Sequence, residues 1–288
     1  MKTVGFALAA ISPTVVRMKQ TEKAERFRAL HEGDKVLLFP NPWDGGSARM
    51  LESLGYRALA TSSAACAATL GRRDGRVTRE ESLAHCRMIV AATDLPVAAD
   101  LENGFGAEPA HVAETIRLAA EVGLVGGSIE DATGNAGLPQ YDLGLATERI
   151  AAAVAAARSL PFPFTVTARA ENFSHGNRDL ADTIRRLRAY EAAGADVLFA
   201  PGLPDLAAVR EVCAAVRKPV NFMVGIAGKS FTVDELAAAG VRRISFASSL
   251  YRSAMTGFLA TAQEIARTGR FDYLATTLTT AQLNAFLS

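Results

Sequence analysis

The chain alternates short apolar runs with longer stretches of helical periodicity, and this alternation repeats eight times. Each apolar run is four to six residues long, the length of a buried strand, and strands that alternate with helices form parallel βα units. The predicted strands span residues 36–41, 58–62, 97–101, 127–130, 165–170, 197–201, 220–224 and 243–247. The predicted helices span residues 46–54, 78–93, 109–122, 145–159, 180–193, 206–216, 233–239 and 249–268. Eight consecutive units predict an α/β fold, a (β/α)8 TIM barrel.

Glycines punctuate this pattern. Gly55, Gly123, Gly194 and Gly240 each follow a predicted helix and precede the next strand. Glycine adopts the left-handed conformation that ends many helices, so the regular spacing favours a closed barrel over an open doubly wound sheet. With 288 residues the chain is long enough for one barrel, and residues 18–288 are expected to form a single domain. A short additional helix is predicted at residues 280–286, outside the barrel.

Residues 1–17 are expected to be a disordered extension. Their apolar stretch is similar to that of a signal peptide, but Ser12-Pro13 interrupts it and it is too short to span a bilayer. A polar, helix-compatible stretch runs from Met18 through Leu30, so the natural start is either Met1 or Met18.

Composition excludes several classes of partner. The net charge of +1 gives no field that would gather nucleic acid, and basic residues are spread along the chain apart from Arg72-Arg73, Arg185-Arg186 and Arg242-Arg243. The three cysteines, Cys66, Cys86 and Cys213, are too widely spaced for a disulfide framework or a zinc site. We expect neither a nucleic-acid nor a membrane partner, and a reducing, cytoplasmic location.

Acidic residues end three of the predicted strands. Asp100-Leu101-Glu102, Glu130-Asp131 and Arg169-Ala170-Glu171 each close an apolar run. The carboxyl ends of barrel strands open onto one face, so these carboxylates can converge on one hard cation and a substrate. Asp100 and Glu102 would point the same way if the strand continued through both. The alternative is a solvated strand end followed by the glycine turn of residues 103–106.

Other strand ends carry groups suited to an acid substrate. Thr61, Ser62, Ser63 and Ala64 offer hydroxyl and N–H groups to a carboxylate, although a serine there also suits a helix N-cap. Arg169 has a guanidinium fork that matches a carboxylate or an enolate oxygen; it could instead be a structural partner of an acid on the neighbouring strand. Asp74, between arginines and a glycine, is either a pocket residue or a surface turn residue.

Taken together, these motifs identify a resemblance. From about residue 25 to the C-terminal helices the chain resembles the isocitrate lyase/phosphoenolpyruvate mutase superfamily. The matching elements are Asn41-Pro42-Trp43-Asp44, Thr61-Ser62-Ser63, Gly71-Arg72-Arg73-Asp74, Asp100-x-Glu102-x-Gly104-x-Gly106, Glu130-Asp131, Ala168-Arg169 and Asn221.

The resemblance implies a site and an assembly. Asp100 would bind Mg²⁺, with Mn²⁺ as the alternative, while Glu102 and Glu130 would hold waters of the ion. The substrate would be a small 2-oxo or 2-hydroxy acid. The protein would form a homotetramer in which the C-terminal helix is exchanged between neighbouring subunits. The residues implied at the substrate are Trp43, Thr61, Ser62, Ser63, Ala64, Asp74, Asp100, Arg169, which would hold an oxygen of the reacting group, and Asn221, which would reach a distal group.

Three departures from the family pattern narrow the reaction. The loop of residues 131–140 contains no Cys, Lys or His, whereas the lyases carry a Lys-Lys/Arg-Cys-Gly-His run there and the mutases and phosphonopyruvate hydrolases carry a Lys. Pro201 stands where relatives have His or Glu, and Glu102 replaces a more frequent Asp. Ordinary isocitrate or 2-methylisocitrate cleavage and phosphoryl chemistry are therefore disfavoured.

The remaining chemistry is Mg²⁺-dependent carbon–carbon cleavage of a small 2-oxo or 2-hydroxy dicarboxylic acid through an enolate. The substrate would be an oxaloacetate-like acid, which is decarboxylated, or a substituted malate. Asp74, Glu171 and His175 are the candidate bases. The alternatives are a phosphonopyruvate hydrolase or phosphoenolpyruvate mutase, a 2-methylisocitrate lyase-like enzyme, and a metal- and dicarboxylate-binding protein with weak activity. The other histidines, His31, His85 and His111, are expected at the surface.

Overall fold

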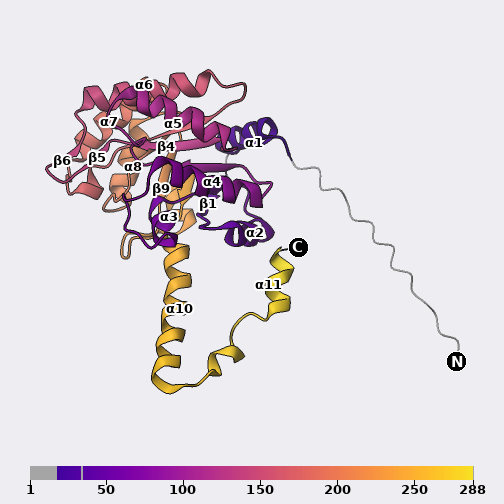
Figure 1. Ribbon diagram of the computed structural model, residues 1–288. Coiled ribbons are helices and arrows are strands. Elements are labelled where there is room, and N and C mark those ends of the chain that lie inside the picture. The colour runs from indigo at the N-terminus through magenta and orange to yellow at the C-terminus, as the bar shows by residue number, and fades with distance from the viewer. Residues whose placement is uncertain (1–17, 34, 288) are drawn as a thin grey trace, which may run out of the picture.

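A computed structural model describes residues 18–33 and 35–287 (Figure 1), so the predicted extension of residues 1–17 lies outside the described residues. Within these ranges eight parallel strands form one sheet in the order β1-β10-β9-β8-β7-β4-β3-β2. They are β1 Leu37–Phe39, β2 Leu59–Ala60, β3 Val97–Asp100, β4 Gly126–Glu130, β7 Thr165–Arg169, β8 Val197–Phe199, β9 Val220–Met223 and β10 Arg243–Ser245. The predicted (β/α)8 barrel is confirmed.

The barrel is nearly closed between its first two strands. The Ala60 backbone N–H donates to the Pro40 carbonyl at 3.0 Å. The Asn41 side chain donates to the Thr61 carbonyl and accepts from the Phe246 N–H, both at 2.8 Å. One buried amide therefore ties together the segments that follow β1, β2 and β10.

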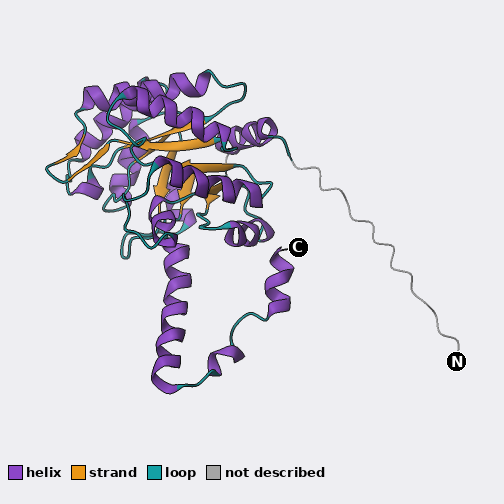
Figure 2. Ribbon diagram, in the orientation of Figure 1, coloured by secondary structure: helices purple, strands orange, loops and turns teal. Residues whose placement is uncertain are grey.

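Helices surround the strands (Figure 2). They are α2 Gly45–Ser53, α4 Arg79–Ala92, α5 Pro109–Glu121, α6 Leu143–Arg158, α7 Leu180–Ala192, α8 Leu206–Ala215, α9 Val233–Ala238 and α10 Ser249–Thr268. Six of them begin at an Asp or Thr whose side chain accepts a backbone N–H of the first turn, the usual N-cap. Strand residues such as Val166 and Leu198 and helix residues such as Ile116 share one buried apolar cluster.

Helix α1, Gln20–Glu32, packs its apolar side chains against the barrel strands. Phe27 is fully buried, with its ring centroid 5.4 Å from that of Phe39. A Cβ at Gly126 would lie 3.0 Å from the Phe27 ring and 2.9 Å from the Thr165 carbonyl, so only glycine fits there. This packing confirms the helix-compatible stretch predicted from Met18 to Leu30.

Two elements were not expected from the sequence. Helix α3, Ser63–Thr69, starts directly at the end of β2, and Ser62 is its N-cap. The loop after β4 contains an antiparallel hairpin of β5 Ala132–Asn135 and β6 Leu138–Gln140. Its polar and glycine-rich sequence lacks the apolar alternation that marks a strand. Short 3₁₀ helices also occur at η1 Phe173–His175 and η2 Asp272–Ala275.

Helix α10 extends away from the barrel, and the chain then returns to place α11, Thr280–Leu287, beside α2 (Figure 1). The Arg49 guanidinium donates to the Leu287 carbonyl at 2.8 Å. The additional C-terminal helix is therefore confirmed. Large apolar side chains are exposed along this arm: Met255, Phe258, Leu259, Phe271, Leu274, Leu278, Leu283 and Leu287. No helix in the described ranges is long and apolar enough to cross a membrane.

Candidate active site

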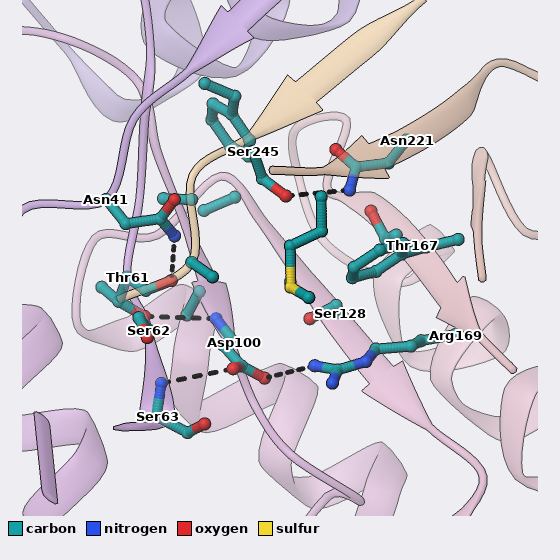
Figure 3. A pocket seen from close by; sticks show the side chains of 18 of the residues that line it. Asn41, Thr61, Ser62, Ser63, Asp100, Ser128, Thr167, Arg169, Asn221 and Ser245 are labelled. Atoms are coloured by element: carbon teal, nitrogen blue, oxygen red, sulfur yellow. Dashed lines mark hydrogen bonds and ion pairs between the residues drawn. The ribbon is translucent and has the colours of Figure 1, made fainter. Parts of the chain in front are cut away.

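A cavity of about 230 Å³ lies inside the barrel among the carboxyl-terminal strand ends (Figure 3). The predicted residues that line it are Thr61, Ser62, Ser63, Ala64, Asp74, Asp100, Arg169 and Asn221. Trp43 is not among the described lining residues, and its ring packs edge-on against Tyr251 with centroids 5.7 Å apart. Glu102, Glu130, Glu171 and His175 are likewise outside the described lining set.

Asp100, the last residue of β3, is fixed by backbone donors. One carboxylate oxygen accepts the Ser63 N–H at 3.2 Å and the other accepts the Glu102 N–H at 3.3 Å. The Asp100 N–H donates to the Thr61 hydroxyl at 3.1 Å. The carboxylate is thereby held at the mouth of the cavity, facing Arg169 (Figure 3).

Arg169, the last residue of β7, joins the acids of three strand ends. Its Nη1 lies 3.2 Å from Glu130 Oε2 and 3.8 Å from Asp100 Oδ1, and its Nε pairs with Glu171. Burial alone would lower the pKa of Arg169, but the ion pairs with Glu171, Glu130 and Asp100 outweigh it and raise the pKa. The predicted partnership with Glu130 is present, within the same acidic cluster as Asp100.

Asp100 and Glu102 would point the same way only if the strand continued through both, and this condition is not met. Strand β3 ends at Asp100, and Glu102 adopts a left-handed φ of 49°. This turn brings the Glu102 carbonyl to the Glu130 N–H at 3.0 Å. Burial, together with Asp100 and Asp74, raises the pKa of Glu102 to about 7, and burial raises the pKa of Glu130 well above its usual value.

These side chains fit a hard divalent cation. Four acids lie together at the mouth of the cavity: Asp100, Glu102, Glu130 and Glu171. Arg169 pairs with three of them, Asp100, Glu130 and Glu171. Acids gathered in this way, largely shielded from water, are stabilised by Mg²⁺ or Mn²⁺, which prefer oxygen ligands. Among the described residues, no three His, Cys, Asp or Glu side chains are close enough together to bind one ion directly.

The structure separates the three candidate bases. Asp74 lines the cavity, hydrogen-bonds the Ser63 side chain, and has a pKa raised by burial and by Asp100. Glu171 is buried, its side chain only 3% exposed, and is held by Arg169. His175 is exposed on η1. Asp74 is thus the candidate with direct access to a substrate in the cavity.

Comparison with known proteins assigns the chain to a family. The profile of the family described as phosphoenolpyruvate phosphomutase matches residues 27–266. The chain belongs to this family. It is 30% identical over 240 residues to 2-methylisocitrate lyase of Escherichia coli (strain K12), covering 79% of each chain.

Solved structures support the same assignment. A protein of Burkholderia cenocepacia J2315, described only as a lyase or mutase, is 52% identical with a TM-score of 0.91, over 93% of this chain and 96% of that one. A 2,3-dimethylmalate lyase is 28% identical with a TM-score of 0.82, over 92% and 94%. Oxaloacetate acetylhydrolase with bound oxalate is 25% identical with a TM-score of 0.85, over 93% and 94%. The relatives of this family thus include lyases and a hydrolase that act on small carboxylic acids.

In this phosphomutase-family chain, Asp131 is a buried structural anchor beside the site. Its Oδ2 accepts from the Tyr190 hydroxyl at 2.6 Å and from Arg186 Nη1 at 3.0 Å. Its Oδ1 accepts from the Glu171 N–H at 2.9 Å and from Gln140 Nε2 at 3.1 Å. One carboxylate therefore fixes both the backbone of Glu171 and the base of the hairpin. The sequence placed Asp131 in a site motif but did not distinguish this role.

Two histidines expected at the surface pack against other side chains or backbone: His85 is buried and His31 is half-buried. His85 is buried, and its Nε2 lies 2.8 Å from the Trp43 carbonyl. His31 sits edge-on to Phe27, with its Nδ1 2.8 Å from the Phe27 carbonyl and its Nε2 3.3 Å from Arg243 Nη1. Burial and the Arg243 charge lower the pKa of His31 to about 3, so the ring is neutral. A neutral ring with Nδ1–H donating to the carbonyl leaves Nε2 to accept from Arg243.

The His31 environment predicts a loss of stability in acid. Protonation is disfavoured in the folded state, so between pH 6.5 and about 3 the unfolded chain binds the proton and stability falls as the pH falls. For this one group the loss from pH 7 to pH 5 is at most about 2 kcal/mol. In urea unfolding, the variant His31→Gln should gain that amount relative to the parent chain between these pH values. The control is His111→Gln, an exposed imidazole; a difference that does not vary with pH would contradict the prediction.

Proposed function

We propose that the protein is a Mg²⁺-dependent carbon–carbon lyase for a small 2-oxo or 2-hydroxy dicarboxylic acid. The observation that supports this most strongly is the position of Arg169 between Asp100 and Glu130 at the mouth of a small cavity. When bound at Asp100, Mg²⁺ would supply a Lewis acid that stabilises the negative charge developing on the oxygen of an enolate.

The chain's own groups have complementary tasks in this proposal. The Ser62 and Ser63 hydroxyls and the Ala64 backbone, all on the cavity wall, receive the carboxylate next to the reacting carbon. Arg169 places a permanent positive charge beside the oxygen that becomes negative in the enolate. Asp74, whose pKa is raised by burial and by Asp100, accepts the proton of the substrate hydroxyl when the substrate is a malate.

The hairpin and the cavity size narrow the reaction. Residues 131–140 fold into β5–β6 and bring no Cys, Lys or His over the mouth. This disfavours reactions that need a thiol acid or a phosphoryl-binding lysine from that loop. A cavity of about 230 Å³ suits an acid of a few carbon atoms. Decarboxylation of an oxaloacetate-like acid and cleavage of a substituted malate both fit these limits.

The test is a substrate panel. Oxaloacetate, 2,3-dimethylmalate, 2-methylisocitrate and phosphonopyruvate are incubated with the protein plus Mg²⁺, or with a chelator, and products are assigned by NMR. Metal-dependent formation of pyruvate from one of the first two supports the proposal, whereas oxalate and acetate from oxaloacetate would instead indicate a carbon–carbon hydrolase. Phosphate release from phosphonopyruvate would indicate a phosphonopyruvate hydrolase instead. Succinate formed from 2-methylisocitrate would indicate a 2-methylisocitrate lyase. Metal-dependent oxalate binding without any product would indicate a binding protein.

Arg169 carries a prediction of its own. Arg169→Lys keeps the charge but loses the fork that reaches Glu130, Asp100 and Glu171 together. We expect kcat/KM to fall about 100-fold, the typical effect of removing one oriented donor at a developing oxyanion. Arg158→Lys, in an exposed pair with Asp196, is the control and should stay near parent activity. Parent activity in both variants would show that a point charge at residue 169 is sufficient.

We also propose a homotetramer in which the α10–α11 arm packs against a neighbouring subunit. The support is the row of exposed apolar side chains on that arm, including Phe258, Leu259 and Leu274. Light scattering tests this: a tetramer is expected, and a monomer at micromolar concentration would contradict it. We further propose that the protein is cytoplasmic and that its binding partner is the small acid substrate.

A further inference from the structure

A second guanidinium lies deeper in the same cavity. Arg243 is the first residue of β10, is 4% exposed, and lines the cavity with Asn221, Thr167 and Ser245. Its Nε donates to Asn221 Oδ1 at 2.8 Å and its Nη2 donates to the Thr167 hydroxyl at 3.0 Å. The Phe39 ring lies against its other side, with the guanidinium carbon 5.0 Å from the ring centroid.

This cation has no acidic partner among the described residues. The side chains bonded to it are a neutral amide, a hydroxyl and the neutral His31 ring. Burial lowers the pKa of Arg243 to about 9, which still leaves it protonated at neutral pH. A buried charge is normally paired, because burying it alone is unfavourable. Arg243 therefore differs from Arg169, which is surrounded by carboxylates.

Some N–H groups of the Arg243 guanidinium are not used by these contacts. Arginine has five N–H groups in a planar fork, and three of them point to Asn221, Thr167 and His31. The two that remain have no partner within the described chain. A carboxylate is the group whose two oxygens match such a fork.

The register places the two guanidinium groups at different depths. Thr167 and Arg169 are two residues apart on β7 and both line the cavity, so their levels differ by about 6.6 Å along the strand. Arg243 is bonded at the Thr167 level. The cavity thus has an upper layer with Arg169 and the acids, and a lower layer with Arg243 among neutral polar groups.

Asn221 holds Arg243 in place. Its carbonyl oxygen accepts from Arg243, and its amide nitrogen donates to the Ser245 hydroxyl at 3.0 Å (Figure 3). With both ends of the amide engaged within the barrel, Asn221 acts as a positioning residue. The distal substrate group that Asn221 was expected to reach is better served by the charged fork beside it.

We propose that Arg243 binds the distal carboxylate of the substrate, so that the second acid group of a diacid points down into the barrel. This inference rests on the proposed function for the position of the first carboxylate, and it specifies the substrate class as dicarboxylic. It also explains why a full positive charge is kept without an acidic neighbour: the substrate supplies the counter-charge.

The test uses a matched pair of ligands, malate and 2-hydroxybutyrate, which differ in the distal group alone at equal carbon number. Calorimetry with the Mg²⁺-loaded full-length protein should give malate an affinity about 10- to 100-fold higher, the range expected for a charge-assisted bidentate contact. Arg243→Met should abolish this preference, while Arg243→Lys should keep part of it. Oxalate, short enough for the upper layer alone, should bind all three proteins within about threefold.

Each result bears on the proposal. Equal binding of malate and 2-hydroxybutyrate to the parent protein would overturn it without any variant, even if Arg243→Met failed to fold. Loss of oxalate binding together with malate binding in a folded Arg243→Met protein would show a structural role for Arg243 and also overturn it. Because binding is measured, absence of turnover on the substrate panel would refute the lyase proposal and leave this test intact.

Discussion

Replacing Asp100 with asparagine is expected to lower kcat/KM by about 1000-fold, the scale of losing one essential electrostatic group in an active site. Asparagine matches aspartate in size, so β3 should survive, although only one of the two backbone N–H groups then keeps an oxygen acceptor. What is lost is the negative charge that Ser63 N–H and Glu102 N–H orient toward the mouth of the cavity. The affinity for Mg²⁺ or Mn²⁺ should fall in parallel, and it can be measured by calorimetry without any substrate.

The matched control is Asp142→Asn, the same chemical change at the N-cap of α6. Asparagine is as good an N-cap as aspartate, so stability and activity should stay near the parent values. If Asp100→Asn retains activity within tenfold of the parent chain, Asp100 does not organise the site and the proposed chemistry at this strand end is wrong.

Replacing Asp131 with asparagine is expected to reduce the free energy of unfolding by about 3 kcal/mol, the loss typical of breaking a buried ion pair. Asp131 is 3% exposed and accepts hydrogen bonds from Arg186, Tyr190, Gln140 and the Glu171 backbone. Asparagine leaves two of these four donors facing an amide NH2 group, because each Asp131 oxygen accepts from two of them, and it removes the charge beside Arg186. Urea unfolding followed by circular dichroism measures the change.

The comparison for this variant is Asp272→Asn. Asp272 pairs with Arg270 at 2.7 Å, but both side chains are about 70% exposed, and such pairs contribute less than about 1 kcal/mol. A loss of similar size in the two variants would mean that burial of the Asp131 cluster adds nothing to stability.

The barrel was predictable because strand and helix periodicities differ and repeat. The strand ends of the site were predictable for the same reason: once β3, β4 and β7 are placed, Asp100, Glu130 and Arg169 must share one face. Helix α3 and the hairpin escaped prediction because the first is a short run of small residues and the second is polar and glycine-rich, and neither carries a clear periodic signal.

Two site residues show where sequence pattern alone fails. Glu102 lies in a left-handed turn that non-glycine residues adopt infrequently, so the alternation of a strand does not apply to its side chain. The sequence showed Arg243 only as part of the basic pair Arg242-Arg243 and as the start of a predicted strand. Arg242 is exposed and Arg243 is buried, as neighbours on opposite faces of a strand are. Its partner in function would be a ligand, which a sequence does not contain.

The most direct measurement is a titration of metal-free protein with Mn²⁺ that follows bound metal by electron paramagnetic resonance and product release in the same samples. Turnover of the best panel substrate should rise in proportion to occupancy of one ion per chain and disappear with a chelator. Oxalate should increase the affinity of the parent protein for Mn²⁺ and should have no such effect on the Asp100→Asn variant. Turnover that is independent of metal occupancy, or occupancy unaffected by the loss of Asp100, would contradict a metal-assisted lyase at this site.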